Sequence, residues 1–481
     1  MDLRALPWPR ILLIALALAT VVGFFVYPTY PNYDSLYSLI WGREILHGHT
    51  PSFTAYRAPT EHPLAVAFGA VMSLFGTSGD RLMIGATLAS FVALVAGMYR
   101  LAAAAFTPLV GLVAAGLLLT RFDFAFLAVR GYIDIPYLAL VVWAAALEAQ
   151  RRRRGMPVFV LLALASLLRP EAWLLMGLYW LWFNLPRATP WATRAKTAAI
   201  AAIGPVVWLI VDQLATGDAL FSLHSTSTLA DELGRAKGVS AVPHATWAFL
   251  VALDKKYVLV AAFAGLALAI LLVPRRLGMP TLMLLIGLAT FGLVGLAGLS
   301  IINRYLLVPS LMVMVFAGVA VGGWTMLEPG GLLRRGWMGV SGGLIAFAVA
   351  WMLINANLVH FTTELDFRTH YRAQLDQLLA APAVKAAERC GPISTPNHKL
   401  IPDIRWAEDL PENRVVARSD PHQARRIRHG LALYVSNRVA VIHQAFTSTT
   451  DPPGIQVPLP GFHRIDTHGY YGAYERCPGQ S

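Results

Sequence analysis

Eleven long stretches without a single charged residue constrain the fold of this chain more than any other feature. A helix of about 20 apolar residues crosses the roughly 30 Å hydrocarbon core of a bilayer, and shorter stretches require polar ends, tilt or local thinning. Only 14% of the residues are charged, whereas soluble domains carry about 25%, so a soluble enzyme is excluded. We predict an all-α polytopic membrane protein of about 11 transmembrane helices, at 11–33, 82–99, 101–120, 135–147, 155–168, 172–186, 197–211, 257–274, 277–303, 305–327 and 336–363.

The loop that follows the first apolar stretch, 34–63, carries a pattern of its own. From Ser35 to Leu46 apolar and aromatic residues recur at helical spacing, which is typical of an amphipathic helix lying in the membrane interface. The apolar segment 62–77 contains Pro63 near its start and is shorter than a typical transmembrane helix. We interpret it as a second interfacial helix, since counting it as a span would reverse every later loop.

The distribution of charge predicts the orientation. With the N-terminus inside, the cytoplasmic segments hold 14 of the 39 Lys/Arg but only 3 of the 27 Asp/Glu, and the remaining chain holds 25 basic and 24 acidic residues. This asymmetry follows the positive-inside rule, so the net charge of +12 indicates topology rather than nucleic-acid binding. The predicted cytoplasmic segments are 1–10, the turn at Arg100, 148–156, 187–196, 275–276 and 328–335.

The C-terminal segment, 364–481, is rich in charged residues, Pro and His, and we predict that it forms a small external α/β domain beside the transmembrane module 1–363. Residues 364–389 are expected to be helical, while Val415–Ala417 and Arg438–Phe446 alternate like short strands. The chain's two cysteines, Cys390 and Cys477, both fall in this segment, where an oxidising compartment would permit a disulfide.

Ionisable residues gather at the predicted external ends of the spans. Such residues at a membrane boundary are functional candidates because burying them without a partner is costly. The second external loop, 121–134, supplies Arg130 and Asp134. Other loops supply Asp34, Glu61, His62, Arg169, Glu171 and Arg304, the last beside Tyr305.

Structural roles compete with each of these interpretations. Asp34 is suited to cap the helix that follows it. Arg130 and Asp134 are four residues apart and could form only an i,i+4 ion pair. Arg169 and Glu171 could belong to a solvated turn, and Arg304 with Tyr305 could be an interfacial anchor.

The order of these motifs resembles that of the GT-C membrane glycosyltransferases, in particular the branch of protein O-mannosyltransferases and lipid A aminoarabinose transferases. That family has an acidic residue just after the first span, two interfacial helices and an acidic–basic–proline step before the next span. The resemblance extends from residue 1 to about 326, and the matching residues are Asp34, Tyr37, Arg43-Glu44, Leu46, Gly48, Pro51, Glu61-His62-Pro63, Asp134, Leu168-Arg169-Pro170-Glu171 and Asn303-Arg304-Tyr305-Leu306-Leu307.

Two departures from the family pattern bear on the chemistry. Many relatives carry two adjacent acidic residues in the first loop, whereas this chain has Asp34-Ser35, which weakens a divalent-metal site. Close relatives place Lys after the Glu, whereas this chain has His62. Phosphate neutralisation is then left to Arg130, Arg304 and a protonated His62, and no metal or other cofactor is expected.

The resemblance implies inverting transfer of a mannose-like or pentose sugar from a polyprenyl-phosphate donor to an extracytoplasmic lipid, glycan or protein acceptor. It assigns Asp34 as the base and Asp134 as a second catalytic carboxylate. A lipid-linked sugar flippase or transporter, and an oligosaccharide polymerase or ligase, are the alternatives. The donor-binding candidates are Glu61, His62, Arg130, Arg304 and Tyr305, and the secondary candidates are Tyr37, Arg57, Arg169 and Glu171.

Overall fold

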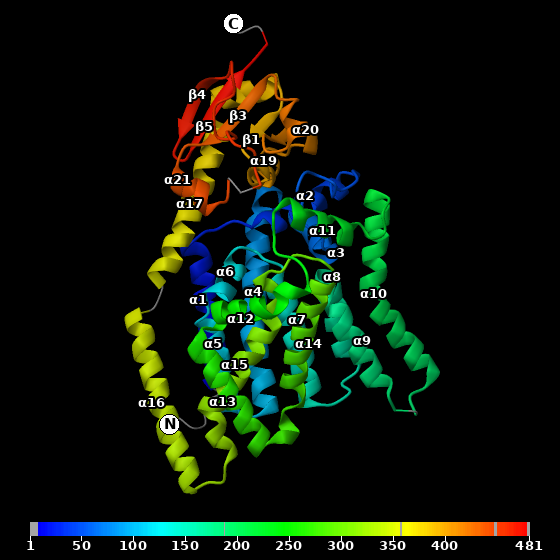
Figure 1. Ribbon diagram of the computed structural model, residues 1–481, viewed down its shortest axis with the longest axis vertical. Coiled ribbons are helices and arrows are strands. Elements are labelled where there is room, and N and C mark those ends of the chain that lie inside the picture. Colours follow the sequence, from blue (N-terminus) through cyan, green and yellow to red (C-terminus); the bar gives the residue numbers. More distant parts are fainter. Residues whose placement is uncertain (1–7, 187, 356–357, 447–449, 479–481) are drawn as a thin grey trace.

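The protein is a helical bundle crowned at one end by a small mixed sheet, as the computed structural model shows (Figure 1). The structure describes residues 8–186, 188–355, 358–446 and 450–478. The first part of the predicted cytoplasmic segment 1–10, and residue 187 of the segment 187–196, lie outside the described residues.

Apolar helices account for most of the bundle. They run α1 Trp8–Val26, α4 Gly79–Ala105, α5 Pro108–Leu119, α6 Phe122–Val129, α7 Asp134–Gln150, α8 Met156–Leu168, α9 Glu171–Asn184, α10 Trp191–Thr216, α12 Val242–Asp254, α13 Lys256–Leu272, α14 Gly278–Leu296, α15 Leu307–Gly322 and α16 Leu332–Asn355. Shorter helices α2 Tyr33–Leu46, α3 Pro63–Ser73 and α11 Phe221–Glu232 lie in the loops at the end that carries the sheet (Figure 1).

A multi-pass membrane protein is consistent with these helices, although the count of eleven spans is not confirmed. Among the described residues, five helices are long and apolar enough to cross a bilayer, or up to seven if two bent pairs each count as one span. The predicted turn at Arg100 is wrong, because α4 continues to Ala105 before Thr107 caps α5. The stretch 101–120 therefore ends one helix and begins another, and α5 with α6 forms a pair bent by 65°.

The loops predicted to be cytoplasmic share one end of the bundle. The Arg276 side chain donates to the Phe106 carbonyl (3.0 Å), and Thr107 hydrogen-bonds Thr325 (2.7 Å). Arg152 lines a cavity at this end together with Arg276. The sheet and the loops rich in candidate residues lie at the opposite end (Figure 1), as the alternation of loops predicts. Which end faces the cytoplasm stays a prediction.

The helix predicted from Ser35 to Leu46 is present as α2, and most of it is buried inside the protein; its place in the membrane interface stays a prediction. Its backbone and that of α3 approach so closely that a Cβ on Gly42 would lie 2.1 Å from the Ala70 nitrogen. A Cβ on Gly69 would lie 2.2 Å from the Ser38 carbonyl oxygen. Glycine at both positions lets the two helices form one layer beneath the sheet.

The C-terminal segment forms a five-stranded sheet of order β2-β1-β3-β5-β4, in which β1 runs parallel to β2 and β3 and the other pairs are antiparallel. Its apolar core includes Tyr30 from the N-terminal part of the chain. The strands are β1 Ile393–Thr395, β2 Val415–Ala417, β3 Gly430–Val435, β4 His463–His468 and β5 Tyr471–Arg476, accompanied by helices α17 Leu358–Ala380, α18 Pro382–Ala387, α19 Ile401–Glu408, α20 Pro421–Ala424 and α21 Arg438–His443.

The predicted strand at Arg438–Phe446 is wrong, whereas the one at Val415–Ala417 is present as β2. Residues 438–443 form helix α21, because the side chain of Asn437 accepts hydrogen bonds from the backbone of Val439 and Ala440. A local cap of this kind stabilises the first helical turn and overrides the alternating pattern. Helices are also present where 364–389 was predicted helical, in α17 and α18.

Two sets of contacts tie the C-terminal segment together and to α2. Cys390 and Cys477 form a disulfide with Cα atoms 5.3 Å apart, closing a loop of 87 residues. Arg43 donates to the carbonyls of α19 residues Arg405 (2.7 Å) and Trp406 (3.2 Å). Glu44 pairs with the buried Arg405 (2.6 Å). Arg43 and Glu44, which belong to the family pattern, therefore hold α2 against the sheet domain.

Candidate active site

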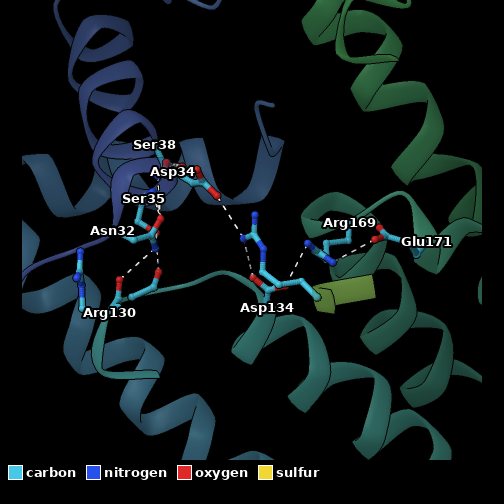
Figure 2. Close-up of polar contacts among 10 residues, drawn as sticks. Asn32, Asp34, Ser35, Ser38, Arg130, Asp134, Arg169 and Glu171 are labelled. Carbon is cyan, nitrogen blue, oxygen red and sulfur yellow. Dashed lines mark hydrogen bonds and ion pairs between the residues drawn. The ribbon is translucent and has the colours of Figure 1, made fainter. Parts of the chain in front are cut away.

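A single guanidinium joins the two carboxylates predicted to be catalytic. Nη1 of Arg304 lies 3.3 Å from Oδ2 of Asp34 and 3.3 Å from Oδ2 of Asp134. Figure 2 shows the two carboxylates, Asp34 and Asp134, on either side of this contact. The Asp34 side chain is 25% exposed, whereas that of Asp134 is fully buried. Asp34 lies in the first turn of α2, Asp134 begins α7 and Arg304 lies in the short turn before α15, so only the packed bundle brings these three residues together. Asp34 is the carboxylate that an incoming molecule can reach.

A second arginine extends this cluster into the bundle. Nη2 of Arg169 lies 3.1 Å from Oδ1 of Asp134, and its Nη1 lies 3.1 Å from Oε1 of Glu171. The Arg169 guanidinium also packs 5.4 Å from the ring centre of Tyr305. Arg169 is 7% exposed, so the interpretation of this segment as a solvated turn is wrong. Burial of this row of charged side chains is tolerated because each charge has a partner of opposite sign.

Asn32, rather than Asp34, caps helix α2. Its Oδ1 accepts hydrogen bonds from the backbone of Asp34 (2.8 Å) and Ser35 (3.4 Å), and its Nδ2 donates to the Arg130 carbonyl (3.1 Å) (Figure 2). The capping role considered for Asp34 is therefore filled by a residue that sequence inspection passed over. The carboxylate of Asp34 is left free to face Arg304.

Two further cations lie near enough to Asp34 to interact with it electrostatically, and sequence reasoning missed both. Lys399, from the turn before α19, holds its ammonium 5.0 Å from the ring centre of Tyr33. Burial lowers the pKa of Lys399, and the nearby carboxylate of Asp34 opposes this effect. Arg235, in the loop after α11, has its pKa lowered by burial and is likewise influenced by Asp34 and Arg304. No ion pair of either side chain is found within the described parts of the chain.

Glu61 belongs to a separate buried group at the start of α3. It accepts a hydrogen bond from the hydroxyl of Ser222, which also lies 2.9 Å from Oδ1 of Asp212. Burial and the neighbouring Asp212 raise the pKa of Glu61 to about 8. This environment favours the protonated form of Glu61, which makes no ion pair with Arg304 or Arg169 within the described residues.

His62 lies near the cluster, but its surroundings favour the neutral ring, whereas neutralising a phosphate would require the protonated ring. Its ring packs 5.6 Å from Trp208. Burial, reinforced by the positive charge of Arg169, lowers the pKa of His62 to about 3. A protonated His62 as a counter-ion for phosphate does not agree with this environment. The neutral imidazole keeps a buried Nδ1 with no partner among the described residues.

Arg130 points away from the carboxylates (Figure 2). Its guanidinium donates to the carbonyls of Tyr30 (3.1 Å) and Pro31 (3.5 Å), and it packs 4.8 Å from the ring centre of Tyr30. No ion pair with Asp134 is present in the described chain, so the i,i+4 alternative is wrong as well. Arg130 therefore fixes the segment that precedes α2, and its predicted contact with the donor phosphate stays a prediction.

The secondary candidates Tyr37 and Arg57 also lie outside the cluster. Tyr37 is fully buried between Tyr33 and Trp41 in an aromatic group. Arg57 pairs with Asp451 (3.0 Å) and Glu232 (3.4 Å), linking the first loop to α11 and to the C-terminal segment. Both residues support the loop that carries Asp34.

The buried side of the cluster leaves little room for a ligand. A cavity of about 20 Å³ lies beside Asp134, Arg169, Arg304 and Tyr305, which is space for about one water molecule. Within the described residues, no three His, Cys, Asp or Glu side chains are grouped as metal ligands would be. The partly exposed carboxylate of Asp34 is therefore the part of the cluster that a substrate can reach.

Comparisons with known proteins identify the fold. No family model matches the chain, and neither does any curated protein. Among solved structures, ArnT from Cupriavidus metallidurans bound to undecaprenyl phosphate is similar over 99% of both chains, with a TM-score of 0.59 and 13% identity. The oligosaccharyltransferase of Archaeoglobus fulgidus, tethered with an acceptor peptide, is similar over 96% of this chain and 74% of that one, with a TM-score of 0.53 and 12% identity. Both similar proteins are GT-C glycosyltransferases.

Proposed function

Because the chain has the GT-C fold, we propose that it is a membrane glycosyltransferase that moves one sugar from a polyprenyl-phosphate donor to an extracytoplasmic acceptor. The observation that supports this best is the reachable carboxylate of Asp34 beside the Arg304 guanidinium. Such a pair supplies a base for the acceptor and a cation for the leaving phosphate. The sugar is a hexose of the mannose type or a pentose.

The chemistry is a single displacement with inversion at the anomeric carbon. Asp34 takes the proton of the acceptor hydroxyl while the acceptor oxygen forms its bond to the anomeric carbon. The bond from that carbon to the phosphate oxygen breaks, and its electron pair stays on the polyprenyl phosphate. A positioned base contributes about 10²- to 10⁴-fold to such a reaction. Asp134 acts by orienting Arg304 and Arg169.

Positive charge suited to the leaving phosphate lies on the accessible side of Asp34. Arg304 contributes a planar donor pair, and Lys399 and Arg235 interact electrostatically with the same carboxylate and have no carboxylate partner of their own in the described chain. Fixed cations that meet charge as it develops lower the barrier more than mobile water does. Lys399 belongs to the C-terminal domain, so that domain would complete the donor site.

A flippase or transporter is the main rival from another functional class. Transporters place their binding groups near the bilayer midplane, often at broken helices. Here Asp134 begins α7, Arg169 separates α8 from α9, and Arg304 precedes α15, so the cluster sits at helix ends. That position favours chemistry at the membrane surface.

The decisive experiment uses purified protein, a polyprenyl-phosphate sugar and a mixture of candidate acceptors, and measures released polyprenyl phosphate. We expect release with the wild type and a loss of about 10²-fold or more with Asp34→Asn, because the amide keeps the size but cannot take the proton. Donor binding, measured separately, should be nearly unchanged. Full transfer by Asp34→Asn would exclude Asp34 as the base, and transport of intact donor without release would favour the flippase. Release of polyprenyl diphosphate with a whole glycan would favour the polymerase or ligase.

A further inference from the structure

A second cavity opens at the end of the bundle opposite Asp34. It encloses about 460 Å³ between α7, α9 and α14. Glu148 lies on its wall, 14 residues beyond Asp134 on α7, which at 1.5 Å per residue separates the two ends by about 21 Å. The space exists because the facing positions carry small side chains, namely Ala104, Ala105, Ala144, Ala145, Ala149 and Gly278.

Three arginines border this cavity. Arg152 follows α7, while Arg275 and Arg276 form the turn between α13 and α14. One nitrogen of Arg276 donates to the Phe106 carbonyl (3.0 Å), which fixes that side chain. Arg152 and Arg275 are exposed and have no side-chain hydrogen bond or ion pair within the described chain. Their guanidinium groups are therefore free to bind an anion.

The one carboxylate in the wall does not neutralise these arginines. Glu148 is 4% exposed and accepts from the backbone of Arg153 (2.6 Å) and Arg154 (3.0 Å). It also accepts from the Trp182 indole (2.9 Å) and the Tyr179 hydroxyl (3.2 Å). These four donors satisfy the Glu148 carboxylate and hold it in place. Through Arg153 and Arg154, the carboxylate in turn fixes the loop that follows α7.

The interior of the cavity is apolar. Its lining includes Leu162, Leu178, Leu282 and Met283, and Leu175 and Ile286 also border the small cavity beneath Asp134. A free inorganic anion would leave this surface uncovered, whereas a hydrocarbon chain would fill it and gain about 25 cal/mol for each Å² taken out of water. A phosphate at the mouth would meet the arginines, which suit phosphate oxygens geometrically.

From these features we propose that the cavity binds an anionic phospholipid, with its phosphate on Arg152, Arg275 and Arg276 and one acyl chain between α7, α9 and α14. On the topology that the charge distribution predicts, this lipid comes from the cytoplasmic leaflet. The site is separate from the sugar-transfer site and does not depend on the transfer reaction.

The test is native mass spectrometry of the full-length protein in detergent, titrated with phosphatidylglycerol or with phosphatidylcholine of the same acyl chains. We expect retention of one phosphatidylglycerol in preference to phosphatidylcholine. The double variant Arg152→Gln/Arg275→Gln should lose at least about tenfold in affinity, the minimum for losing one charge-assisted contact. The matched control is Arg151→Gln/Arg335→Gln, which removes two exposed charges at the same end that do not line the cavity.

Three outcomes would overturn the proposal. Equal loss in the control variant would mean that net charge, rather than this cavity, attracts the lipid. Equal retention of the two lipids would mean that the arginines do not recognise the headgroup charge. Displacement of bound lipid by millimolar inorganic phosphate would mean that the acyl chain contributes nothing and that the site takes a free anion.

Discussion

Among single residues, the cations around Asp34 differ in whether their substitution affects phosphate binding alone or the carboxylates as well. Arg304 holds both carboxylates, so its removal disturbs the base as well as the phosphate site. Lys399 has no carboxylate partner within the described residues, and its ammonium packs against the ring of Tyr33. Lys399 is therefore the residue whose substitution reports most directly on phosphate binding.

We expect Lys399→Gln to weaken binding of the polyprenyl-phosphate donor by about tenfold or more, because a charge-assisted contact is worth about 1.5–3 kcal/mol. Binding is measured by titration of the purified protein with donor. Arg464→Gln, which removes an exposed charge from β4, serves as the control and should bind normally. Unchanged affinity in Lys399→Gln would remove the C-terminal domain from the donor site.

His62 leads to a prediction about pH. Its pKa is lowered to about 3, so folded His62 stays neutral while unfolded His62 takes up a proton below about 6.5. The unfolded state then binds more protons between these values, and stability falls as the pH is lowered from about 6.5 toward 3. We expect His62→Gln to flatten this fall by at most about 1.4 kcal/mol per pH unit.

Thermal unfolding in detergent between pH 5 and 8 measures this effect of His62. His47→Gln, at an exposed position, controls for loss of an imidazole. If donor binding by the wild type, but not by His62→Gln, weakened around pH 6.5, His62 would carry a charge in the site after all.

At the scale of elements, the contact of α2 with α3 positions the base. Asp34 lies in the first turn of α2, and the backbone of this helix touches that of α3 at Gly42 and Gly69. We expect Gly42→Ala to destabilise the protein by about 1–3 kcal/mol, because the added methyl would meet backbone atoms that cannot move aside cheaply. Transfer activity should fall as α2 shifts.

Gly85→Ala is the matched control for the helix contact. Gly85 lies inside α4 with nothing within 4 Å of an added Cβ, so alanine should stabilise the helix by up to about 1 kcal/mol. Melting temperature and transfer rate are measured for both variants. If the two substitutions had the same effect, close packing of α2 on α3 would not be what holds Asp34.

At the scale of the whole molecule, orientation in the bilayer can be read by cysteine labelling. Both native cysteines are bonded to each other, so they do not compete for a maleimide reagent. We expect a cysteine at exposed Thr228, at the end that carries the sheet, to react with a membrane-impermeant maleimide on intact cells. A cysteine at Arg151 should react only after the cells are permeabilised. The reverse pattern would invert the topology and place the C-terminal domain inside.

Features that depend on local composition follow from the amino-acid sequence alone. Charge-free stretches predict apolar helices, loop charges predict which loops share an end, and the placement of Asp34 and Asp134 at span ends predicts a boundary site. These predictions follow from the transfer of side chains into hydrocarbon, which is nearly additive along the chain. The helix at 438–443 shows the limit of this approach, since one capping residue outweighed the alternation.

Which charged side chains meet depends on the packing of the helices in three dimensions. Arg130 is four residues from Asp134 yet binds the carbonyls of Tyr30 and Pro31, while Arg304 lies 170 residues from Asp134 and pairs with it. Lys399 reaches the site because Arg43 and Glu44 fasten α2 to α19. Ion pairs form between groups that packing brings within a few ångströms, and the order of residues along the chain does not specify that distance.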